Sequence, residues 1–272
     1  MKKMFKIELS RAIKSRAMVS AILIGLIITV AHNIQYNTAA INFIKMASKY
    51  NKPMYSPPNA IIDWIGGKYT AQSFLYYLIL PILACIPFAD SFFTDKKSGY
   101  IKNVLIRANR KDYFIGKYLA TFIAAGIAVV MPLIVNLIIT SMFLPSYVPN
   151  VSTYGQIGQV SMWSKVLFTH PYIYILGYLI IDFMFSGFIA TIGLSISLIA
   201  EYRFMVIIAP FLIYVFIYSV LGSFNLESYI PLIFLQPYSY KNKFIIILLE
   251  TVIMFLITAS TFLIKGKKED IY

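Results

Sequence analysis

Long runs of apolar residues alternate with short polar segments along this chain of 272 residues. A helix needs roughly 20 mostly apolar residues to cross a bilayer. Six segments reach that length: about Ala17 to Gln35, Ala71 to Phe93, Tyr113 to Leu144, Pro171 to Ala200, Phe204 to Leu221 and Phe244 to Ile264. The pattern predicts an all-α polytopic membrane protein with six transmembrane helices.

A polar island, Thr94 to Lys117, carries seven Lys or Arg residues and separates the second and third predicted spans. Within it, apolar side chains recur at helical spacing, which predicts one apolar face; they are Ile101, Val104, Leu105 and Ala108. Gly99 breaks the chain before this helix, and Asp112 is placed to cap the next span. The segment is therefore predicted to be a helix that a cytoplasmic partner binds.

Two further segments are too short or too polar to cross the membrane. Residues 1 to 16 place Phe5, Leu9, Ala12 and Ile13 on one side and lysines on the other, which predicts an amphipathic helix on the inner leaflet. It is either a basic anchor or a mechanical elbow before the first span. Tyr229 to Leu235 is apolar, is punctuated by prolines and predicts a re-entrant outer hairpin between spans five and six.

Small residues recur every fourth position in several spans and predict the faces on which helices pack together. They are Ala17, Ala21, Gly25 and Thr29 in the first span, Ala120, Ala124 and Ala128 continuing to Asn136 in the third, and Asp182, Ser186, Ala190, Gly193 and Ser197 in the fourth. No internal repeat or long linker is evident. We therefore expect one transmembrane domain over 1–272, made of an interfacial helix (1–16), spans one and two (17–93), a cytoplasmic segment (94–112), spans three to six (113–264) and a tail (265–272).

Composition and charge agree with this arrangement. With 59% apolar and 13% charged residues, the chain cannot surround one soluble core. If both termini are inside, the inner segments hold 17 of the 24 Lys and Arg residues, as expected for cytoplasmic loops. The net charge of +13 is then explained by topology and anionic lipid headgroups, and nucleic acid is not an expected partner.

Three acidic residues fall inside the apolar runs, where ionisable groups are costly and often functional. Asp182 is predicted near the midplane, Glu250 near the outer end of the sixth span, and Asp90 near enough to the inner surface to reach the headgroups. Asp182 and Glu250 are either structural or in contact with a cargo or a proton, and Asn136 joins them as a candidate pathway residue. His32 and His170 lie apart at outer ends, so no metal site is predicted.

Beside these general features, the cytoplasmic segment carries a specific pattern. Asp95-x-x-Ser98-Gly99-Tyr100, then Leu105 and Arg107, then Arg110-Lys111-Asp112-Tyr113 and Gly116-Lys117 resemble the first cytoplasmic loop of type-2 ABC exporter permeases. The elbow helix, six spans, the turn Glu201-Tyr202-Arg203 and the outer hairpin are similar to that family too. The chain departs from the family at Tyr100, where a Thr is usual, and at Asp95, where Glu is common.

The resemblance implies a permease subunit that is not itself an enzyme. Two copies of a separate ATPase subunit, which bind ATP and Mg²⁺, would grip the Ile101 to Ala108 helix, with Val104 and Leu105 in the partner's groove and Glu201 to Arg203 as a second contact. A second permease copy or a related permease, together with membrane lipids, would complete the assembly in a bacterial plasma membrane. The implied cargo is amphipathic: a peptide antibiotic, a drug or a lipid-linked molecule.

Two other classes of protein remain as alternatives. An ion-coupled carrier would use Asp182 as its proton site and would work without ATP. A membrane-embedded enzyme of lipid chemistry would need Asp90, Asp182 and Glu250 to converge at one depth, whereas the sequence predicts them at inner, middle and outer levels.

Overall fold

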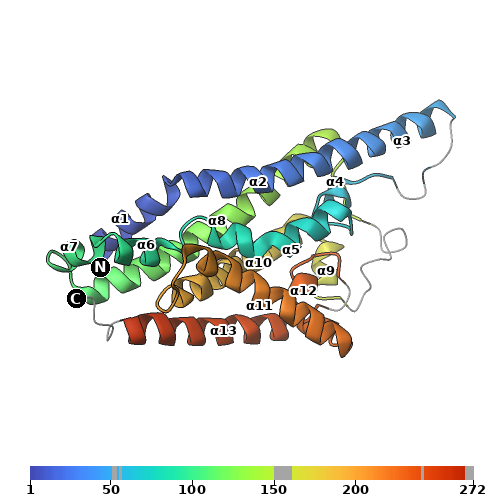
Figure 1. Ribbon diagram of the computed structural model, residues 1–272. Helices are drawn as coiled ribbons and strands as arrows, with labels where there is room; N and C mark the ends of the chain where they lie inside the picture. Colours follow the sequence, from blue (N-terminus) through green and yellow to red (C-terminus); the bar gives the residue numbers. More distant parts are fainter. Residues whose placement is uncertain (51–53, 55–56, 150–160, 240–241, 267–272) are drawn as a thin grey trace.

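The computed structural model describes residues 1–272 except 51–53, 55–56, 150–160, 240–241 and 267–272 (Figure 1). The part of the chain that it describes is helical and contains no strand. The elements are α1 (Lys2–Ile13), α2 (Arg16–His32), the π-helical η1 (Asn33–Asn37), α3 (Thr38–Lys49), α4 (Ala60–Asp63), α5 (Ala71–Cys85), α6 (Ser91–Lys97), α7 (Tyr100–Leu105), α8 (Arg110–Phe143), α9 (Ser164–Leu167), α10 (Pro171–Ile196), α11 (Arg203–Ser223), the 3-10 helix η2 (Glu227–Tyr229), α12 (Pro231–Phe234), α13 (Phe244–Ala259) and η3 (Ser260–Lys265).

Five of these helices, counted among the described residues, are long and apolar enough to cross a membrane. They are Arg16–Lys49, Arg110–Phe143, Pro171–Ile196, Arg203–Ser223 and Phe244–Ile264. The chain is thus a multi-pass membrane protein. The start of α1 and the end of η3 lie at the same end of the bundle (Figure 1).

The predicted second span, Ala71 to Phe93, is shorter in the structure than its hydropathy suggests. The apolar helix α5 has 15 residues and ends at Cys85. Pro87 follows two residues later, and proline lacks the N–H that a continuing helix would need. A turn over residues 86–90 leads into α6, which begins at Ser91.

The first predicted span differs in the opposite direction, because the helix does not stop near Gln35. It continues through η1 into α3 and reaches Lys49. At 1.5 Å per residue, its 34 residues measure about 50 Å, well beyond the roughly 30 Å of a hydrocarbon core. No residue of α3 is buried, and α3 projects beyond the other helices (Figure 1).

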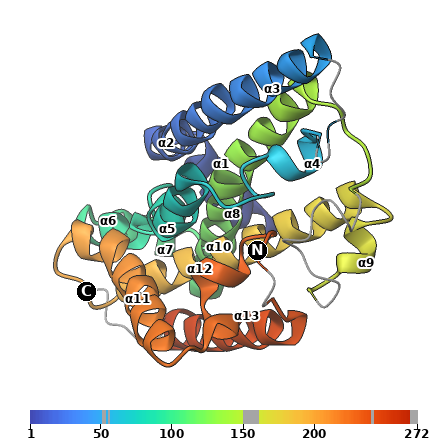
Figure 2. The ribbon, with the colours of Figure 1, turned by 90° about the vertical axis from the view of Figure 1, so that its right-hand side faces the viewer.

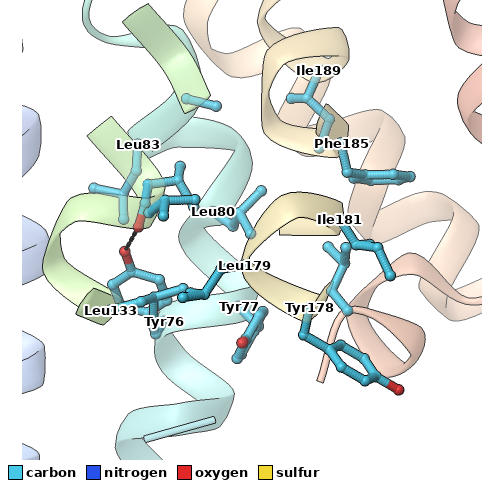
Figure 3. Close-up of a cluster of buried hydrophobic side chains, with 14 of the residues drawn as sticks. Tyr76, Tyr77, Leu80, Leu83, Leu133, Tyr178, Leu179, Ile181, Phe185 and Ile189 are labelled. Atoms are coloured by element: carbon cyan, nitrogen blue, oxygen red, sulfur yellow. Dashed lines mark hydrogen bonds between the residues drawn. The ribbon is translucent and has the colours of Figure 1, made fainter. Parts of the chain in front are cut away.

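The core of the bundle is formed by α5, α8 and α10, with α2, α11 and α13 around them (Figure 2). Figure 3 shows its centre, where Tyr76, Tyr77 and Leu80 of α5 lie between Leu133 of α8 and Leu179 of α10. The Tyr76 hydroxyl donates to the Val129 carbonyl at 2.5 Å, so this buried polar group is satisfied within the membrane-spanning region.

The predicted packing faces are confirmed by burial. In α8 the whole series is buried: Ala120, Ala124, Ala128, Pro132 and Asn136. The same holds for the α10 series from Asp182 to Ser197, and for Ala21, Gly25 and Thr29 of α2. Small side chains let α2, α8 and α10 approach closely where lipid supplies no hydrophobic drive for helix association.

The segment predicted to form an outer hairpin contains a short helix. Pro231 begins α12, and Leu232 and Phe234 are buried in the bundle. Asn242 donates to the Phe234 carbonyl at 3.0 Å, and Tyr174 of α10 donates to the Pro237 carbonyl at 2.6 Å. These bonds hold the segment against α10.

Candidate functional site

The predicted cytoplasmic segment folds as two short helices, α6 and α7, at the end of the bundle where α1 begins (Figure 1). Gly99 joins them with φ of 73°, a left-handed conformation that favours glycine, so the predicted break is confirmed. Ser98 supports the turn, since its hydroxyl donates to the Asp95 carbonyl at 3.3 Å. The helix α7 ends at Leu105, and Ala108 lies beyond it in a bend.

The apolar face of this segment is directed at the protein itself. Ile101 is buried in a cluster with Phe92, Tyr113 and Phe114, and Val104, Leu105 and Ala108 pack against the same cluster half-buried. Val104 and Leu105 remain partly exposed, so their placement in a partner's groove stays a prediction. The exposed apolar side chain is Ile106, at 82%, with Arg107 exposed beside it.

Four charged side chains lie directly beneath the segment and form what we call the ion network: Glu8, Arg11, Asp95 and Lys117. Arg11 of α1 donates to the two Asp95 oxygens at 2.7 and 3.1 Å and to Glu8 at 2.9 Å. Lys117 of α8 contacts Asp95 Oδ2 at 2.5 Å and Glu8 Oε2 at 3.0 Å. Glu8, Asp95 and Lys117 are buried, and two cations balance two carboxylates.

Aromatic side chains contact the charged groups of the ion network. The Tyr113 hydroxyl donates to Asp95 Oδ2 at 3.0 Å. The Arg11 guanidinium lies 4.4 Å from the centre of the Tyr100 ring, and Lys117 Nζ lies 5.0 Å from that of Phe88. Both distances are within the range of cation–π attraction. Through Tyr100 the ion network also reaches α7, so α1, α6, α7 and α8 meet at one place.

The electrostatics of the ion network shift the pKa values of Asp95 and Arg11 toward their charged forms. Burial acts to raise the pKa of Asp95, but hydrogen bonds from Arg11 and Lys117 and their positive charges outweigh it, so the pKa is lowered. For Arg11, burial acts to lower the pKa, and the hydrogen bond to Asp95 together with the charge of Glu8 raises it further above its ordinary value. Asp95 and Arg11 therefore remain charged at neutral pH.

Close approach of the backbones makes these contacts possible. A Cβ atom on Gly116 would lie 3.2 Å from the backbone nitrogen of Phe5, so a side chain here would push α1 away from α8 by a few tenths of an ångström. The helix α1 also buries a different face from the predicted one. Met4, Glu8 and Ala12 are buried, whereas Ile13 is exposed.

Sequence reasoning identified Asp95 but missed the roles of Glu8, Arg11 and Lys117. Two signals were present. Glu8 is the sole acid in the first 16 residues, four positions from the small residue Ala12 on the same helix face. Lys117 is an ionisable residue four positions inside the predicted third span, and such a residue calls for a buried partner.

The start of α8 is capped differently from the prediction. Asn109, not Asp112, is the N-cap, and its side chain accepts from the Lys111 backbone N–H at 3.1 Å. Asp112 lies in the first turn, where it pairs with the amino terminus of Met1 at 2.5 Å. The amino terminus is thereby tied to the same end of α8 as the ion network.

A second ion pair fixes the turn between α10 and α11. Arg203 pairs with Asp90, which lies in the turn before α6. Asp90 is buried, so the expectation that it reaches the lipid headgroups is wrong. Glu201 and Arg203 are both exposed, and the Arg203 guanidinium contacts Asp90.

Asn136 has a structural position on the face between α2 and α8. Its Nδ2 donates to the Thr29 carbonyl at 3.0 Å and to Asn33 Oδ1 at 2.9 Å, and its Oδ1 accepts from the Ile65 backbone N–H at 2.9 Å. Both ends of the amide are occupied. Its assignment as a pathway residue is corrected, because the whole amide is engaged in joining the Thr29 carbonyl, the Asn33 side chain and the Ile65 N–H.

The other two candidate pathway residues, Asp182 and Glu250, lie on different helices, α10 and α13. Asp182 is fully buried in α10, with one hydrogen bond, from Tyr77 at 3.4 Å, and its Oδ1 has no partner within the described ranges. Glu250 is half-buried on α13 and has no ion-pair partner among the residues placed by the structure. No group of three His, Cys, Asp or Glu side chains that could hold a metal occurs in that part of the chain either.

A groove of about 980 Å³ runs between α1 and the α7 end of the cytoplasmic segment. Its lining combines apolar side chains, such as Ile7, Val104 and Ile106, with the charged Lys3 and Arg107. The groove opens beside the exposed Ile106, so α1 and α7 together offer an amphipathic surface near the ion network.

Comparison with known proteins finds one relevant similarity. The chain is 27% identical over 134 residues to the uncharacterized protein YybM of Bacillus subtilis (strain 168). The match covers 47% of this chain and 51% of that protein, so the chain aligns with about half the length of this relative. No family model and no solved structure matches the chain.

Proposed function

We propose that this chain is the membrane permease subunit of an ATP-driven exporter of the type-2 ABC class. The observation that carries the proposal is the ion network, which connects the cytoplasmic segment to the amphipathic helix α1 and to the 34-residue helix α8. In this proposal α6 and α7 receive force from a separate ATPase subunit, and α8 carries it across the membrane.

The physical basis is that buried ion pairs resist separation. Moving α6 away from α1 and α8 would take Asp95 from Arg11 and Lys117 and leave two cations facing the single carboxylate of Glu8, and such an unbalanced buried charge costs several kcal/mol. A force applied to α6 and α7 is therefore transmitted to α1 and α8 and does not merely deform a flexible loop. Surface ion pairs, worth about 0–1 kcal/mol, would not serve this purpose.

The proposed topology has six crossings with both termini in the cytoplasm. Five are the long helices. The sixth is α5, whose 15 residues measure about 22 Å, extended by the turn after Cys85 and by α6 to the inner surface. The helix α12, held against α10, would be the re-entrant hairpin on the outer side.

The proposed assembly contains two copies of the ATPase subunit, which bind ATP and Mg²⁺, and a second permease copy or a related permease. The ATPase would contact Ile106, Arg107 and the groove between α1 and α7, with Glu201 as a secondary contact. The cargo would be amphipathic, a peptide antibiotic, a drug or a lipid-linked molecule, and would pass between permease subunits in a bacterial plasma membrane.

The decisive experiment changes the exposed apolar side chain of Ile106 and leaves the buried core unchanged. Ile106→Asp places a charge on a side chain that is 82% exposed, so folding should be retained. We expect loss of co-purification with the proposed ATPase subunit, and loss of the ATP hydrolysis that the permease stimulates in nanodiscs.

Phe224→Asp is the matched control. Phe224 is 71% exposed just beyond α11, at the end of that helix remote from the cytoplasmic segment. Its substitution should leave co-purification with the ATPase subunit and the stimulated ATP hydrolysis unchanged. If Ile106→Asp retains the ATPase as well as the wild-type protein does, the cytoplasmic segment is not the docking site and the proposal fails.

An ion-coupled carrier is the second candidate, favoured by one observation. Asp182 is fully buried at the centre of α10 with an oxygen that lacks a partner among the described residues. A carrier that works without ATP would lose all transport on Asp182→Asn, whereas the exporter proposed here would keep its partner-stimulated ATP hydrolysis.

A further inference from the structure

A second groove, of about 240 Å³, lies where residues 30–41 of α2, η1 and α3 pass the last turns of α8 (Figure 1). We call it the η1 groove. Ile34 and Phe143 line it and are 67% and 59% exposed, so it opens on the outside of the bundle, toward lipid. Its volume is below the roughly 300–1,000 Å³ of sites that enclose a whole small molecule, so it fits one part of a larger ligand.

The η1 groove lies near a boundary of the hydrocarbon core. Arg16 begins α2, and at 1.5 Å per residue Asn33 is about 26 Å farther along the helix. The hydrocarbon core is roughly 30 Å thick. With Arg16 at one membrane surface, Asn33 is therefore close to the opposite level at which lipid chains join their headgroups.

Two buried amide side chains line the η1 groove, and each has one group without a partner. Asn33 is 7% exposed and Asn37 is 3% exposed. Asn33 Nδ2 and Asn37 Oδ1 have no hydrogen-bond partner within the described part of the chain. The two amides are neighbours, because Asn37 Nδ2 donates to Asn33 Oδ1 at 3.3 Å. Buried polar groups are rarely left unpaired, and here a free donor and a free acceptor belong to adjoining amides.

The chemistry of this lining selects a neutral ligand with a hydroxyl. No charged residue lines the η1 groove among the residues that the structure describes, so nothing there balances an ionic group. A carbonyl could accept from Asn33 but would leave Asn37 without a donor. A hydroxyl donates and accepts at once. Water does so too, but the apolar walls formed by Ile34 and Phe143 suit a hydrocarbon chain beside the polar group.

We propose that the η1 groove binds a neutral glycerolipid that has a free hydroxyl, a diacylglycerol in its simplest form. The lipid hydroxyl accepts from Asn33 Nδ2 and donates to Asn37 Oδ1. The start of one acyl chain lies against Ile34 and Phe143. The π-helical form of η1 agrees with a binding role, since π-helical turns within α-helices are frequent at functional sites. This site is separate from the ion network and does not depend on the proposed exporter function.

The probe is a diacylglycerol with a photoreactive diazirine in one acyl chain. The purified chain is photolysed with it in phosphatidylcholine nanodiscs, whose lipids carry no hydroxyl, and labelled peptides are mapped by mass spectrometry. We expect saturable labelling of residues 30–41 and of the last turns of α8. Labelling that does not saturate, or that falls on other helices, overturns the proposal.

Two unlabelled competitors isolate the hydroxyl. Dioctanoylglycerol has it, and the dioctanoyl ester of propanediol has a hydrogen in its place. We expect dioctanoylglycerol to compete about tenfold better, because it alone makes both hydrogen bonds. Equal competition shows that water or nothing occupies the two amides and overturns the proposal. Glycerol should not compete, and competition by glycerol at the same concentration would assign the groove to a small polyol instead of a lipid.

Asn37→Ala removes the acceptor for the lipid hydroxyl. Asn33 Oδ1 keeps its bonds from Asn136 at 2.9 Å and Thr140 at 3.0 Å, so folding should be retained. We expect the two competitors to become equal in this variant, which a merely structural change would not cause. Asn42→Ala is the matched control, because Asn42 is exposed on α3 and does not line the groove. It should keep the tenfold preference.

A blocking variant keeps the proposal testable if Asn37→Ala does not fold. Thr38 lines the η1 groove and is exposed, so Thr38→Trp fills the groove from its surface and should abolish the saturable labelling. Wild-type labelling in Thr38→Trp, or a preserved tenfold preference in Asn37→Ala, refutes the site. The ATPase subunit is absent from these measurements, so their failure is distinct from failure of the proposed exporter function.

Discussion

Replacing Lys117 with Met removes the buried ammonium group at the centre of the ion network. Lys117 is fully buried, and its Nζ lies 2.5 Å from Asp95 Oδ2 and 3.0 Å from Glu8 Oε2. The variant leaves two carboxylates facing one guanidinium, so a net negative charge is buried. Met fills a similar volume, and the change therefore isolates the charge from the packing.

The expected loss can be estimated from these contacts. Two unit charges 4 Å apart interact by about 4 kcal/mol at an effective dielectric constant of 20. Lys117 has two such partners, and the cost of burying its ammonium offsets part of the gain. One-sided removal of a buried ion pair costs about 3–5 kcal/mol. We therefore expect a loss of that size, which lowers the melting temperature by at least about 6 °C.

The assay is thermal unfolding of the purified protein in detergent, followed by the fluorescence of the buried Trp64 at a fixed scan rate. Lys102→Met removes an exposed cation from α7 and should change the melting temperature little. The double variant Glu8→Gln with Lys117→Met restores neutrality and should recover part of the loss. A Lys117→Met protein as stable as wild type, or a double variant no better than the single one, would show that the ion network does not stabilise this junction.

Three further outcomes follow from the other polar sites. Folding lowers the pKa of Asp95, so the stability that its carboxylate contributes is fully present above its unfolded pKa of about 4 and is lost as the pH falls through its folded pKa. The difference in melting temperature between wild type and Asp95→Asn should therefore shrink below about pH 4. A difference that stays constant with pH contradicts this. Asn136→Leu removes the acceptor of the Ile65 N–H and should cost about 1–3 kcal/mol of stability, against little change for the exposed control Asn103→Leu. Asp182→Asn keeps the hydrogen bond with a neutral amide and should leave the melting temperature unchanged or raised; a fall of several degrees would indicate a partner for the carboxylate.

The six apolar runs led to the right class and to most of the helices, because hydropathy over about 20 residues is a local property of the chain. The same reasoning located the packing faces, since small residues every fourth position share one side of a helix. It was less accurate at the ends of spans. Pro87 shortens α5, and the π-helical η1 lets the first helix continue to Lys49.

By itself, the sequence determined that the chain is helical, that it belongs in a membrane and that a basic segment with an apolar face separates its second and third apolar runs. The tertiary structure decided where that face points and which charges meet beneath it. Arg11 and Asp95 are 84 positions apart, and no periodicity within a helix can relate them. They form an ion pair only because α1, α6 and α8 pack together, and packing across helices is a property of the whole fold.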